Sequence, residues 1–336
     1  MMKALILAPF AHQHLRRLAR RLELRYEPWT QTRRLYDPEE LAHRLRSEGI
    51  AILIVEADFV LAPTLEEAAP PLRLVGVCRN ALDHIDLPAA TERGVLVVHS
   101  PGRNAVAVTE LTLGLMLSLA RRIPQAHNLV AGGGWQDPVG PYIEMQGREM
   151  AGSTVGIVGL GQIGFEVAKR LRALGARLLA YDPYAPPERL RRSGARAMPL
   201  PELMAAADFV TLHAPSTSET QGLIDAEMLG LMKPTAYLVN TADASLVDVE
   251  ALLAALQEGR IAGAALDVHE GHPLPPKSPF LALPNVILTP HIGGATVETV
   301  ERHSRIMAQE VERFLAGRPL RCLANPEALV NLPLES

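Results

Sequence analysis

Short apolar runs of strand length alternate with helical patterns along the first part of the chain. Strands are expected at residues 4–8, Ile50–Val55, 72–77 and 95–99, and a helix is expected at residues 13–21. Such alternation is typical of βαβ units, which place parallel strands side by side in one sheet. The pattern therefore predicts a small doubly wound α/β domain that ends near Ser100.

A second alternating segment begins after the break at residues 101–102. A helix is expected over residues 104–121, followed by a looser stretch at residues 131–151 that Trp135 is expected to pack against. The strands expected beyond it are Thr154–Val158, Arg177–Tyr181, 209–213, Tyr237–Asn240, 263–267 and 286–289. That number of strands is typical of a dinucleotide-binding domain. A last helix, Val297–Leu315, follows after this sheet is complete.

Composition and charge narrow the functional classes. The chain has 336 residues, of which 48% are hydrophobic, enough for two domains with sizeable cores. A formal net charge of -4 gives no reason to expect nucleic acid or an anionic membrane as a partner. The longest apolar stretch, residues 111–120, is too short to span a bilayer. Cys78 and Cys322 form neither a disulfide framework nor a zinc site, so a cytoplasmic location is expected.

A glycine fingerprint follows the expected strand Thr154–Val158 and begins a helix. Its first glycine, Gly159, permits a tight turn, and its second, Gly161, lets the backbone approach a pyrophosphate. The third, Gly164, lets the helix pack closely on the strand. The N–H groups at the helix N-terminus favour the bound anion. The cofactor site is therefore expected here, with Gln162 and Ile163 also in it.

The acid that the fingerprint requires about twenty residues further on is Asp182. Its carboxylate is expected to accept hydrogen bonds from the adenosine ribose and to repel the additional phosphate of NADP. Residues 183–185 supply no Arg for that phosphate. The sequence therefore predicts NAD as the cofactor, with Tyr181 and Pro183 beside Asp182 in the site. The structural alternative is that Asp182 is only a turn residue before Pro183.

The chain resembles the D-isomer-specific 2-hydroxyacid dehydrogenases, the family of phosphoglycerate and formate dehydrogenases. The segments that carry the resemblance are residues 101–104, 159–164, 212–215, 219–220, 239–242, 265–268 and 289–294. The resemblance implies an α/β fold with two doubly wound parallel-sheet domains. In it, an NAD-binding Rossmann domain, residues 101–291, is inserted into a flavodoxin-like substrate domain formed by residues 1–100 and 292–336. It also implies a small-molecule substrate, an active site in the cleft and a homodimer through the NAD-binding domain.

The resemblance extends the expected cofactor site along the ends of the later strands. Asp267 would hold the nicotinamide carboxamide and set which face of the ring is offered. The other residues implied are His213, Ala214, Pro215, Thr220, Asn240, Thr241, Ala242, His291, Gly293 and Gly294.

The family's chemistry uses a His as general acid–base, a Glu that orients this His, and an Arg that binds the substrate carboxylate. His291 matches the His, but Asp243 stands at the Arg position and His272 at the Glu position. An Arg about 4 Å from a carboxylate is worth on the order of 4 kcal/mol at an effective dielectric of about 20, and an acid there gives repulsion of similar size. A neighbouring imidazole at His272 disfavours charge on His291. We therefore expect a neutral His291 at pH 7 unless Asp243 is its partner.

Substrate-binding residues are expected on the loops that follow the first strands. Glu56 follows Ile50–Val55, Arg79 and Asn80 lie in the next loop, and Asn104 matches a polar position of the family. Arg79 is expected to be the only cation near the acids Glu56 and Asp243. An acidic site of this kind favours a neutral or cationic alcohol or carbonyl compound over a plain 2-oxo acid.

Three functional hypotheses follow from these residues. The first is an NAD-dependent oxidoreductase that acts on the CH–OH group of a small hydroxy or oxo compound with altered specificity, in which His291 transfers the proton, assisted by His272 or Asp243. The second is a catalytically degenerate NAD-binding protein that works as a sensor or interaction module. The third is a metal site formed by these three side chains. The sequence favours the first, and no metal is expected.

Overall fold

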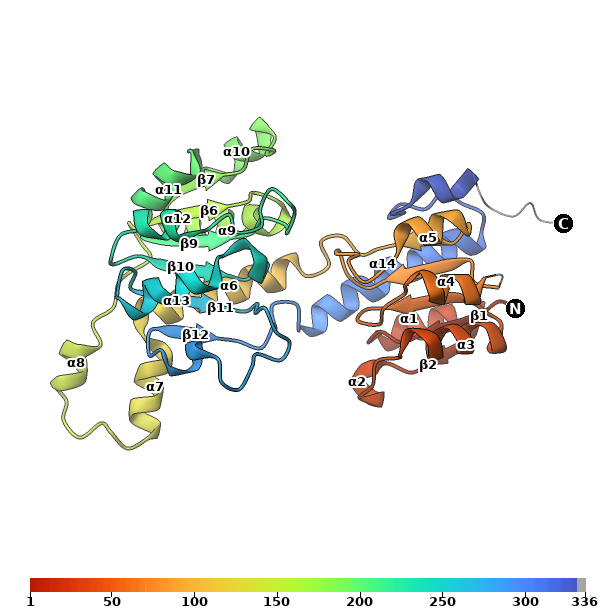
Figure 1. Ribbon diagram of the computed structural model, residues 1–336, viewed down its shortest axis with the longest axis horizontal. Helices are drawn as coiled ribbons and strands as arrows, with labels where there is room; N and C mark the ends of the chain where they lie inside the picture. The colour runs from red at the N-terminus through yellow and green to blue at the C-terminus, as the bar shows by residue number, and fades with distance from the viewer. Residues whose placement is uncertain (70, 331–336) are drawn as a thin grey trace. The chain divides into compact units, whose positions relative to one another are not determined.

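The chain forms two compact units in a computed structural model that describes residues 1–69 and 71–330. Unit 1 consists of Met1–Arg103 and Thr296–Ser336, and unit 2 of Asn104–Ala295 (Figure 1). Each unit is built on one parallel sheet with helices on both faces. The predicted fold class, α/β with two doubly wound parallel-sheet domains, is therefore confirmed.

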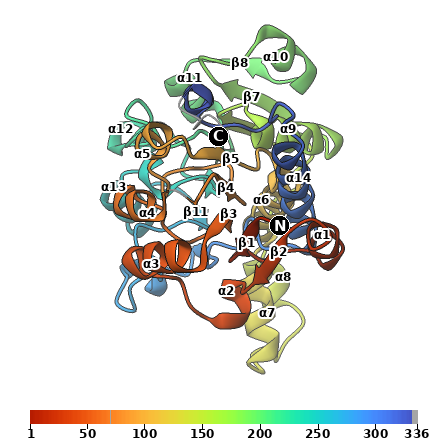
Figure 2. The same ribbon diagram turned by 90° about the vertical axis from the view of Figure 1, so that its right-hand side faces the viewer.

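The sheet of unit 1 has the strand order β2-β1-β3-β4-β5, and its labels can be followed in Figure 2. The strands are β1 (Lys3–Ile6), β2 (Glu23–Tyr26), β3 (Ile50–Val55), β4 (Leu74–Val77) and β5 (Leu96–Val98). This is the flavodoxin-like order, which reverses direction between β1 and β3. The carboxyl ends of these two strands therefore mark the position where a ligand of such a sheet binds.

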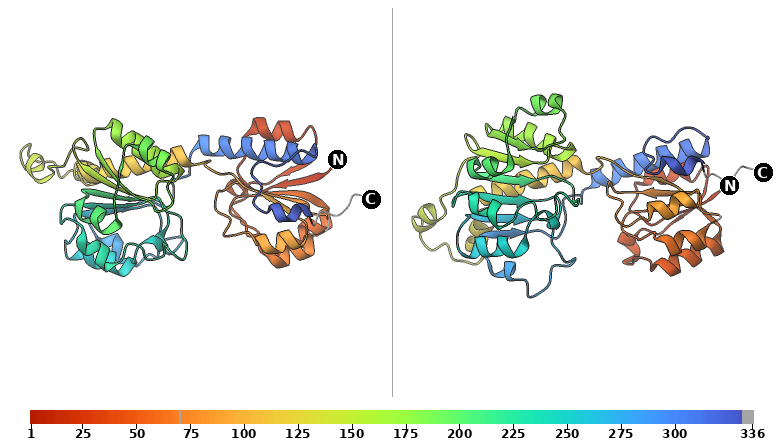
Figure 3. Two further views of the ribbon diagram at one scale, coloured as in Figure 1. Left: turned by 90° about the horizontal axis from the view of Figure 1, so that it is seen from above. Right: turned by 45° about the horizontal axis from the view of Figure 1, so that its top comes forward.

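Two layers of helices cover this sheet because its strands are apolar on both faces. Ile52 and Ile54 of β3 pack in the same core as Met307 of α14, whereas Leu53 and Val55 pack on the opposite face. Figure 3 shows α14 and α1 on one side of the sheet and the helices between β2 and β5 on the other. The helices are α1 (His12–Leu18), α2 (Trp29–Thr32), α3 (Pro38–Glu48), α4 (Ala62–Ala68), α5 (Leu87–Glu92), α14 (Val297–Leu315) and the 3-10 helix η3 (Pro326–Val330).

The sheet of unit 2 has the strand order β12-β11-β10-β9-β6-β7-β8, the Rossmann arrangement with one further strand. Its direction reverses between β6 and β9, which is where a dinucleotide is expected to bind. The strands are β6 (Thr154–Val158), β7 (Arg177–Tyr181), β8 (Arg196–Ala197), β9 (Phe209–Leu212), β10 (Tyr237–Asn240), β11 (Gly263–Leu266) and β12 (Val286–Leu288).

Helices cover both faces of this second sheet as well. Residues of α6 and α9 form one core with the strands, and residues of α11, α12 and α13 form the other. The helices are α6 (Ala105–Arg121), α7 (Ile123–Ala131), α8 (Gly140–Glu144), α9 (Gln162–Ala173), α10 (Pro187–Ser193), α11 (Leu200–Ala206), α12 (Ala226–Leu231), η1 (Ala244–Leu246), α13 (Val249–Gln257) and η2 (Pro279–Ala282). In the part of the chain that the structure covers, no helix is both long enough and apolar enough to cross a membrane.

Candidate active site

The glycine loop between β6 and α9 is closely packed on one side and open on the other. Gly159 has a φ of 90°, and a Cβ there would lie 2.5 Å from the backbone nitrogen of Ala214. A Cβ on Gly164 would lie 2.0 Å from the carbonyl oxygen of Gly159, so only glycine permits this approach of helix to strand. A Cβ on Gly161, in contrast, meets no atom within 4 Å. The loop therefore leaves space at Gly161, beside the N-terminus of α9, where the pyrophosphate of a dinucleotide fits.

Two alanine variants separate these roles. Gly161→Ala is expected to change the free energy of unfolding by less than about 0.5 kcal/mol, yet to weaken NADH binding about tenfold because its methyl group occupies the predicted pyrophosphate position. Gly164→Ala is expected to cost about 2 kcal/mol or more in stability because of the overlap with Gly159. Thermal unfolding and NADH fluorescence titration measure the two effects. Wild-type NADH affinity in Gly161→Ala would contradict the placement of the pyrophosphate.

The carboxylate of Asp182 accepts hydrogen bonds from the glycine loop and from the turn after β7. Its Oδ2 accepts a hydrogen bond from the backbone N–H of Leu160 at 2.7 Å, and its Oδ1 accepts one from Tyr184 at 2.9 Å. The hydroxyl of Tyr184 donates to Glu219, which joins the loop after β7 to the loop after β9. None of these three contacts was expected from the sequence. The expected hydrogen bonds from Asp182 to the adenosine ribose stay a prediction.

The ends of β9 and β10 place four expected cofactor residues. His213 is buried, and burial lowers its pKa to about 3, so its ring is neutral under ordinary conditions. Its Nε2 lies 3.0 Å from Oγ1 of Thr211. Thr241 Oγ1 lies 2.9 Å from Oγ1 of Thr112, and Asn240 Oδ1 accepts from the N–H of Ala242. These contacts fix the turns after both strands.

Asp267, which is buried, organises the loop that carries His291. Its carboxylate accepts hydrogen bonds from Thr289 Oγ1 at 2.6 Å, from the N–H of Ile292 at 2.9 Å and from the N–H of Gly293 at 2.7 Å. His291 lies within this loop at a φ of 55°, a left-handed conformation that costs a non-glycine residue energy. The strained backbone is retained because Asp267 fixes the residues on both sides of it. This positioning contact was not anticipated from the sequence.

His272 and His291 contact each other directly. Nε2 of His272 lies 2.8 Å from Nδ1 of His291, and the ring centroids are 5.0 Å apart. Such a hydrogen bond needs one donor and one acceptor, so at most one of the two rings can carry both of its protons. Nδ1 of His291 is therefore engaged by His272, and Nε2 is the other ring nitrogen of His291.

The side chain of Asp243 makes hydrogen bonds within its own turn. Its Oδ1 accepts hydrogen bonds from the N–H of Ser245 at 2.9 Å and from the hydroxyl of Ser245 at 2.7 Å, which caps the 3-10 helix η1. Its backbone oxygen accepts from Nδ2 of Asn240. Over residues 1–69 and 71–330, no group of three or more His, Cys, Asp or Glu side chains could hold a metal ion. The hypothesis that Asp243 completes a metal site with His272 and His291 is therefore not supported.

The expected substrate residues lie in both units. Glu56 follows β3, and Arg79 and Asn80 follow β4, where their backbone oxygens accept from Ser100 and His99 respectively. The expectation that Arg79 is the only cation near Glu56 is wrong, because Nη1 of Arg103 lies 2.6 Å from Oε1 of Glu56. In unit 2, a Cβ on Gly294 would lie 3.6 Å from the side chain of Asn104, so these two predicted residues are brought together.

The remaining predicted cofactor residues lie on the same loops of unit 2. Gln162 and Ile163 form the first turn of α9, Tyr181 ends β7, and Pro183 follows it. Ala214 and Pro215 follow β9, and the hydroxyl of Thr220 donates to the backbone oxygen of Pro215 at 2.6 Å. Fold and loops together define a dinucleotide-binding α/β protein with a histidine pair next to the last strands of its Rossmann sheet.

Comparison with known proteins gives the family. Residues 113–293 match the family description "D-isomer specific 2-hydroxyacid dehydrogenase, NAD binding domain". A glyoxylate reductase from Thermofilum pendens is 42% identical over 303 residues, which are 88% of this chain and 87% of the relative. A D-3-phosphoglycerate dehydrogenase from Methanocaldococcus jannaschii is 39% identical over 88% of this chain, which spans only 55% of that relative. The solved TT0316 protein from Thermus thermophilus superposes with a TM-score of 0.84 at 36% identity, over 96% of this chain and 100% of that one.

The chain belongs to the D-isomer specific 2-hydroxyacid dehydrogenase family. Membership makes it an oxidoreductase of the NAD-dependent 2-hydroxyacid dehydrogenase type, and the matched segment is the family's NAD-binding domain. The predicted cofactor, NAD, is therefore confirmed, and the open space at Gly161 fits it.

Proposed function

We propose that the protein is an NAD-dependent oxidoreductase that acts on the CH–OH group of a small hydroxy or oxo compound, with a specificity altered from that of its family. The observation that carries this proposal is the 2.8 Å contact between His272 and Nδ1 of His291. NAD supplies the hydride acceptor or, when reduced, the hydride. Nε2 of His291 takes the hydroxyl proton in oxidation and returns it to the carbonyl oxygen in reduction.

In this proposal, residues next to His291 hold its ring and its loop in position. His272 orients the ring through Nδ1, in the place of the family's Glu. Asp267 holds the loop around His291 through its three hydrogen bonds. In this proposal unit 2 is the NAD-binding domain, and unit 1 is the substrate domain with Glu56, Arg79 and Asn80. Asn104, at the start of unit 2, is the further substrate-binding residue.

The altered specificity rests on Asp243, which stands where the family has its carboxylate-binding Arg. Arg103 forms an ion pair with Glu56, whereas Asp243 puts a carboxylate at the position of the family's cation and repels an incoming carboxylate. Compounds that are neutral or cationic next to the reacting carbon are therefore the proposed substrates, in preference to a plain 2-oxo acid.

The test is NADH absorbance with purified protein and a panel of 2-oxo acids, aldehydes and uncharged ketones, with the matching alcohols and NAD in the reverse direction. We expect turnover of an uncharged or cationic compound with a higher kcat/KM than glyoxylate. Efficient reduction of glyoxylate by the unmodified protein would overturn the proposed specificity.

A second candidate function is a catalytically degenerate NAD-binding protein that acts as a sensor or interaction module. The engagement of the Asp243 carboxylate by Ser245 favours it, because this side chain then serves the fold rather than a substrate. Tight NADH binding together with no turnover across the whole panel is the outcome that selects this function.

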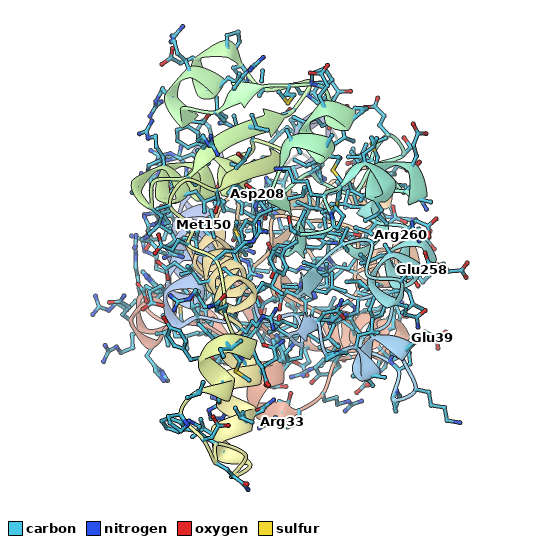
Figure 4. The ribbon with its side chains drawn as sticks, turned by 90° about the vertical axis from the view of Figure 1, so that its left-hand side faces the viewer. Arg33, Glu39, Met150, Asp208, Glu258 and Arg260 are labelled. Carbon is cyan, nitrogen blue, oxygen red and sulfur yellow. The ribbon has the colours of Figure 1, made fainter. Side chains whose placement is uncertain are left out.

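We also propose a homodimer through the NAD-binding domain, in the cytoplasm. The α7–α8 arm, which consists of residues 123–144, extends from the body of unit 2 in Figures 1 and 4. Six of its large apolar side chains are at least half exposed, which is typical of an interaction surface. They are Ile123, Val130, Trp135, Val139, Tyr142 and Ile143. Trp135 is 60% exposed, so the expectation that it packs against its own segment is wrong.

Two matched substitutions test this dimer. Val139→Glu places a charge on the arm, and Val297→Glu places the same charge on α14, where Val297 is 82% exposed. Burial of an unpaired charge in an interface is strongly unfavourable, so Val139→Glu is expected to weaken self-association about a hundredfold or more. Light scattering coupled to size-exclusion chromatography should show a dimer for the wild type and Val297→Glu. A dimer of unchanged affinity in Val139→Glu would contradict the proposed interface.

A further inference from the structure

A charged pair lies at the carboxyl end of the unit 1 sheet. Glu56 directly follows β3, and Nη1 of Arg103 lies 2.6 Å from its Oε1. The two side chains are only 14% and 11% exposed, respectively. Ligands of open α/β sheets bind outside the carboxyl ends of the strands where the strand order reverses, and here this is between β1 and β3.

His303 of α14 connects this pair to the end of β1. Its Nδ1 lies 3.1 Å from Nη1 of Arg103 and its Nε2 lies 2.7 Å from the backbone oxygen of Pro9. An Arg can only donate, so Nδ1 accepts and Nε2 carries the proton that is donated to Pro9. Burial lowers the pKa of His303, which agrees with this neutral ring. Arg302 also donates to the backbone oxygen of Arg103 at 2.9 Å, so Arg103 is held at its backbone and its side chain.

The pair retains unused hydrogen-bonding capacity. Within the described ranges 1–69 and 71–330, no hydrogen bond is made by Nη2 or Nε of Arg103 or by Oε2 of Glu56, and none of these atoms is sealed from solvent. A mostly buried ion pair contributes little to stability, because desolvation offsets most of its attraction. A fixed guanidinium fork with unused donors, next to a carboxylate with an unused acceptor, is instead suited to bind a polar group.

We propose that the Glu56–Arg103 pair binds the head group of the substrate and selects one without net charge. Such a group offers an acceptor oxygen to Arg103 and N–H donors to Glu56, as a primary carboxamide or the zwitterion of an amino acid does. A bare carboxylate is attracted by Arg103 but repelled by Glu56, which lies close enough to offset most of that attraction. This inference rests on the proposed function and deepens it by naming the substrate class.

Binding can be measured without turnover. Protein saturated with NADH cannot oxidise an alcohol, so calorimetric titration with racemic lactate, lactamide and serine compares an anion, an amide and a zwitterion. We expect the wild type to bind lactamide or serine about tenfold or more tightly than lactate. The tighter of these two ligands identifies which kind of neutral head group the pair prefers.

Charge-specific variants give the decisive comparison. Glu56→Gln keeps an acceptor oxygen and removes the charge, so lactate should bind about tenfold more tightly and serine about tenfold more weakly. Arg103→Gln should weaken all three ligands about tenfold or more, with NADH affinity unchanged, because the acceptor oxygen of each loses its fork. Arg16→Gln, on the exposed side of α1 in the same unit, is the charge control and should change each affinity less than about twofold.

The outcomes separate this inference from the proposed function. An unchanged lactate-to-serine affinity ratio in Glu56→Gln overturns the inference, and so does a wild type that binds none of the three ligands. If Arg103→Gln does not fold, Arg103→Lys is used instead, because it keeps the charge without the planar fork. Unchanged lactamide affinity in Arg103→Lys also overturns the inference. Absence of turnover with the expected binding pattern overturns the enzymatic proposal and leaves the head-group site standing.

Discussion

Replacement of His291 by Gln is expected to lower kcat by about a hundredfold to ten-thousandfold on every compound that the protein turns over. His291 is the proposed proton donor and acceptor, and the ring is held in place by His272 at Nδ1 and by the Asp267-bound loop. Gln has no group that titrates near neutral pH, so hydride transfer would have to proceed without general acid–base assistance. Steady-state kinetics and NADH fluorescence titration together check the prediction.

The control is His43→Gln, on the exposed side of α3, which should leave kcat within about twofold of the wild type. NADH affinity is expected to change little in His291→Gln, because the glycine loop is untouched. An equal kcat in His291→Gln and wild type would remove His291 from the mechanism. Turnover would then need another acid, and the contact between the two imidazoles would be structural only.

A third variant, His272→Glu, tests whether the contact between the two histidines sets the pH dependence of turnover. In His272→Glu, a carboxylate replaces the imidazole beside Nδ1 and favours the charged form of His291. The pKa of His291 should then rise, so reduction of a carbonyl compound, which needs the protonated ring, should persist to higher pH than in the wild type. A pH profile identical in the two proteins would show that His272 does not influence the proton on His291.

Much of the fold could be predicted because buried parallel strands are continuous apolar runs. The runs at Ile50–Val55 and Thr154–Val158 are strands with those bounds. Two edge strands were missed for the same reason. Every second residue of β2 (Glu23–Tyr26) is exposed, and both residues of β8 (Arg196–Ala197) are exposed, so neither strand has an apolar run. Helices α7 and α8 were also missed, because they bury no side chain and the glycines and prolines around them are typical of loops.

The cofactor loop was predictable because its glycines have a fixed spacing and fixed steric roles. The ion pair between Glu56 and Arg103 was not, because 46 residues separate the two and only the parallel sheet brings them together. The cap at Asp243 had a local signal: an Asp two residues before a Ser at the start of a short helix is a common N-cap pattern.

Exchange of Asp243 is expected to restore the use of 2-oxo acids in two steps. Asp243→Asn removes the charge and keeps an oxygen that can accept from Ser245, so η1 retains its cap. Repulsion of up to about 4 kcal/mol between two carboxylates about 4 Å apart, reduced by solvent, predicts a rise in kcat/KM for glyoxylate of about tenfold to a hundredfold. Asp243→Arg adds a guanidinium fork, and a further rise of about tenfold or more is expected.

The two variants also separate charge from structure. Arg cannot accept from Ser245, so Asp243→Arg should lose about 1 kcal/mol of stability, whereas Asp243→Asn should lose little. Kinetics with glyoxylate and with an uncharged aldehyde, together with thermal unfolding, distinguish the effects. If neither variant gains activity on glyoxylate while both still bind NADH, repulsion by Asp243 does not control substrate choice, and its carboxylate serves only to cap η1. If both gain as expected, repulsion by Asp243 limits the use of substrates with a carboxylate beside the reacting carbon.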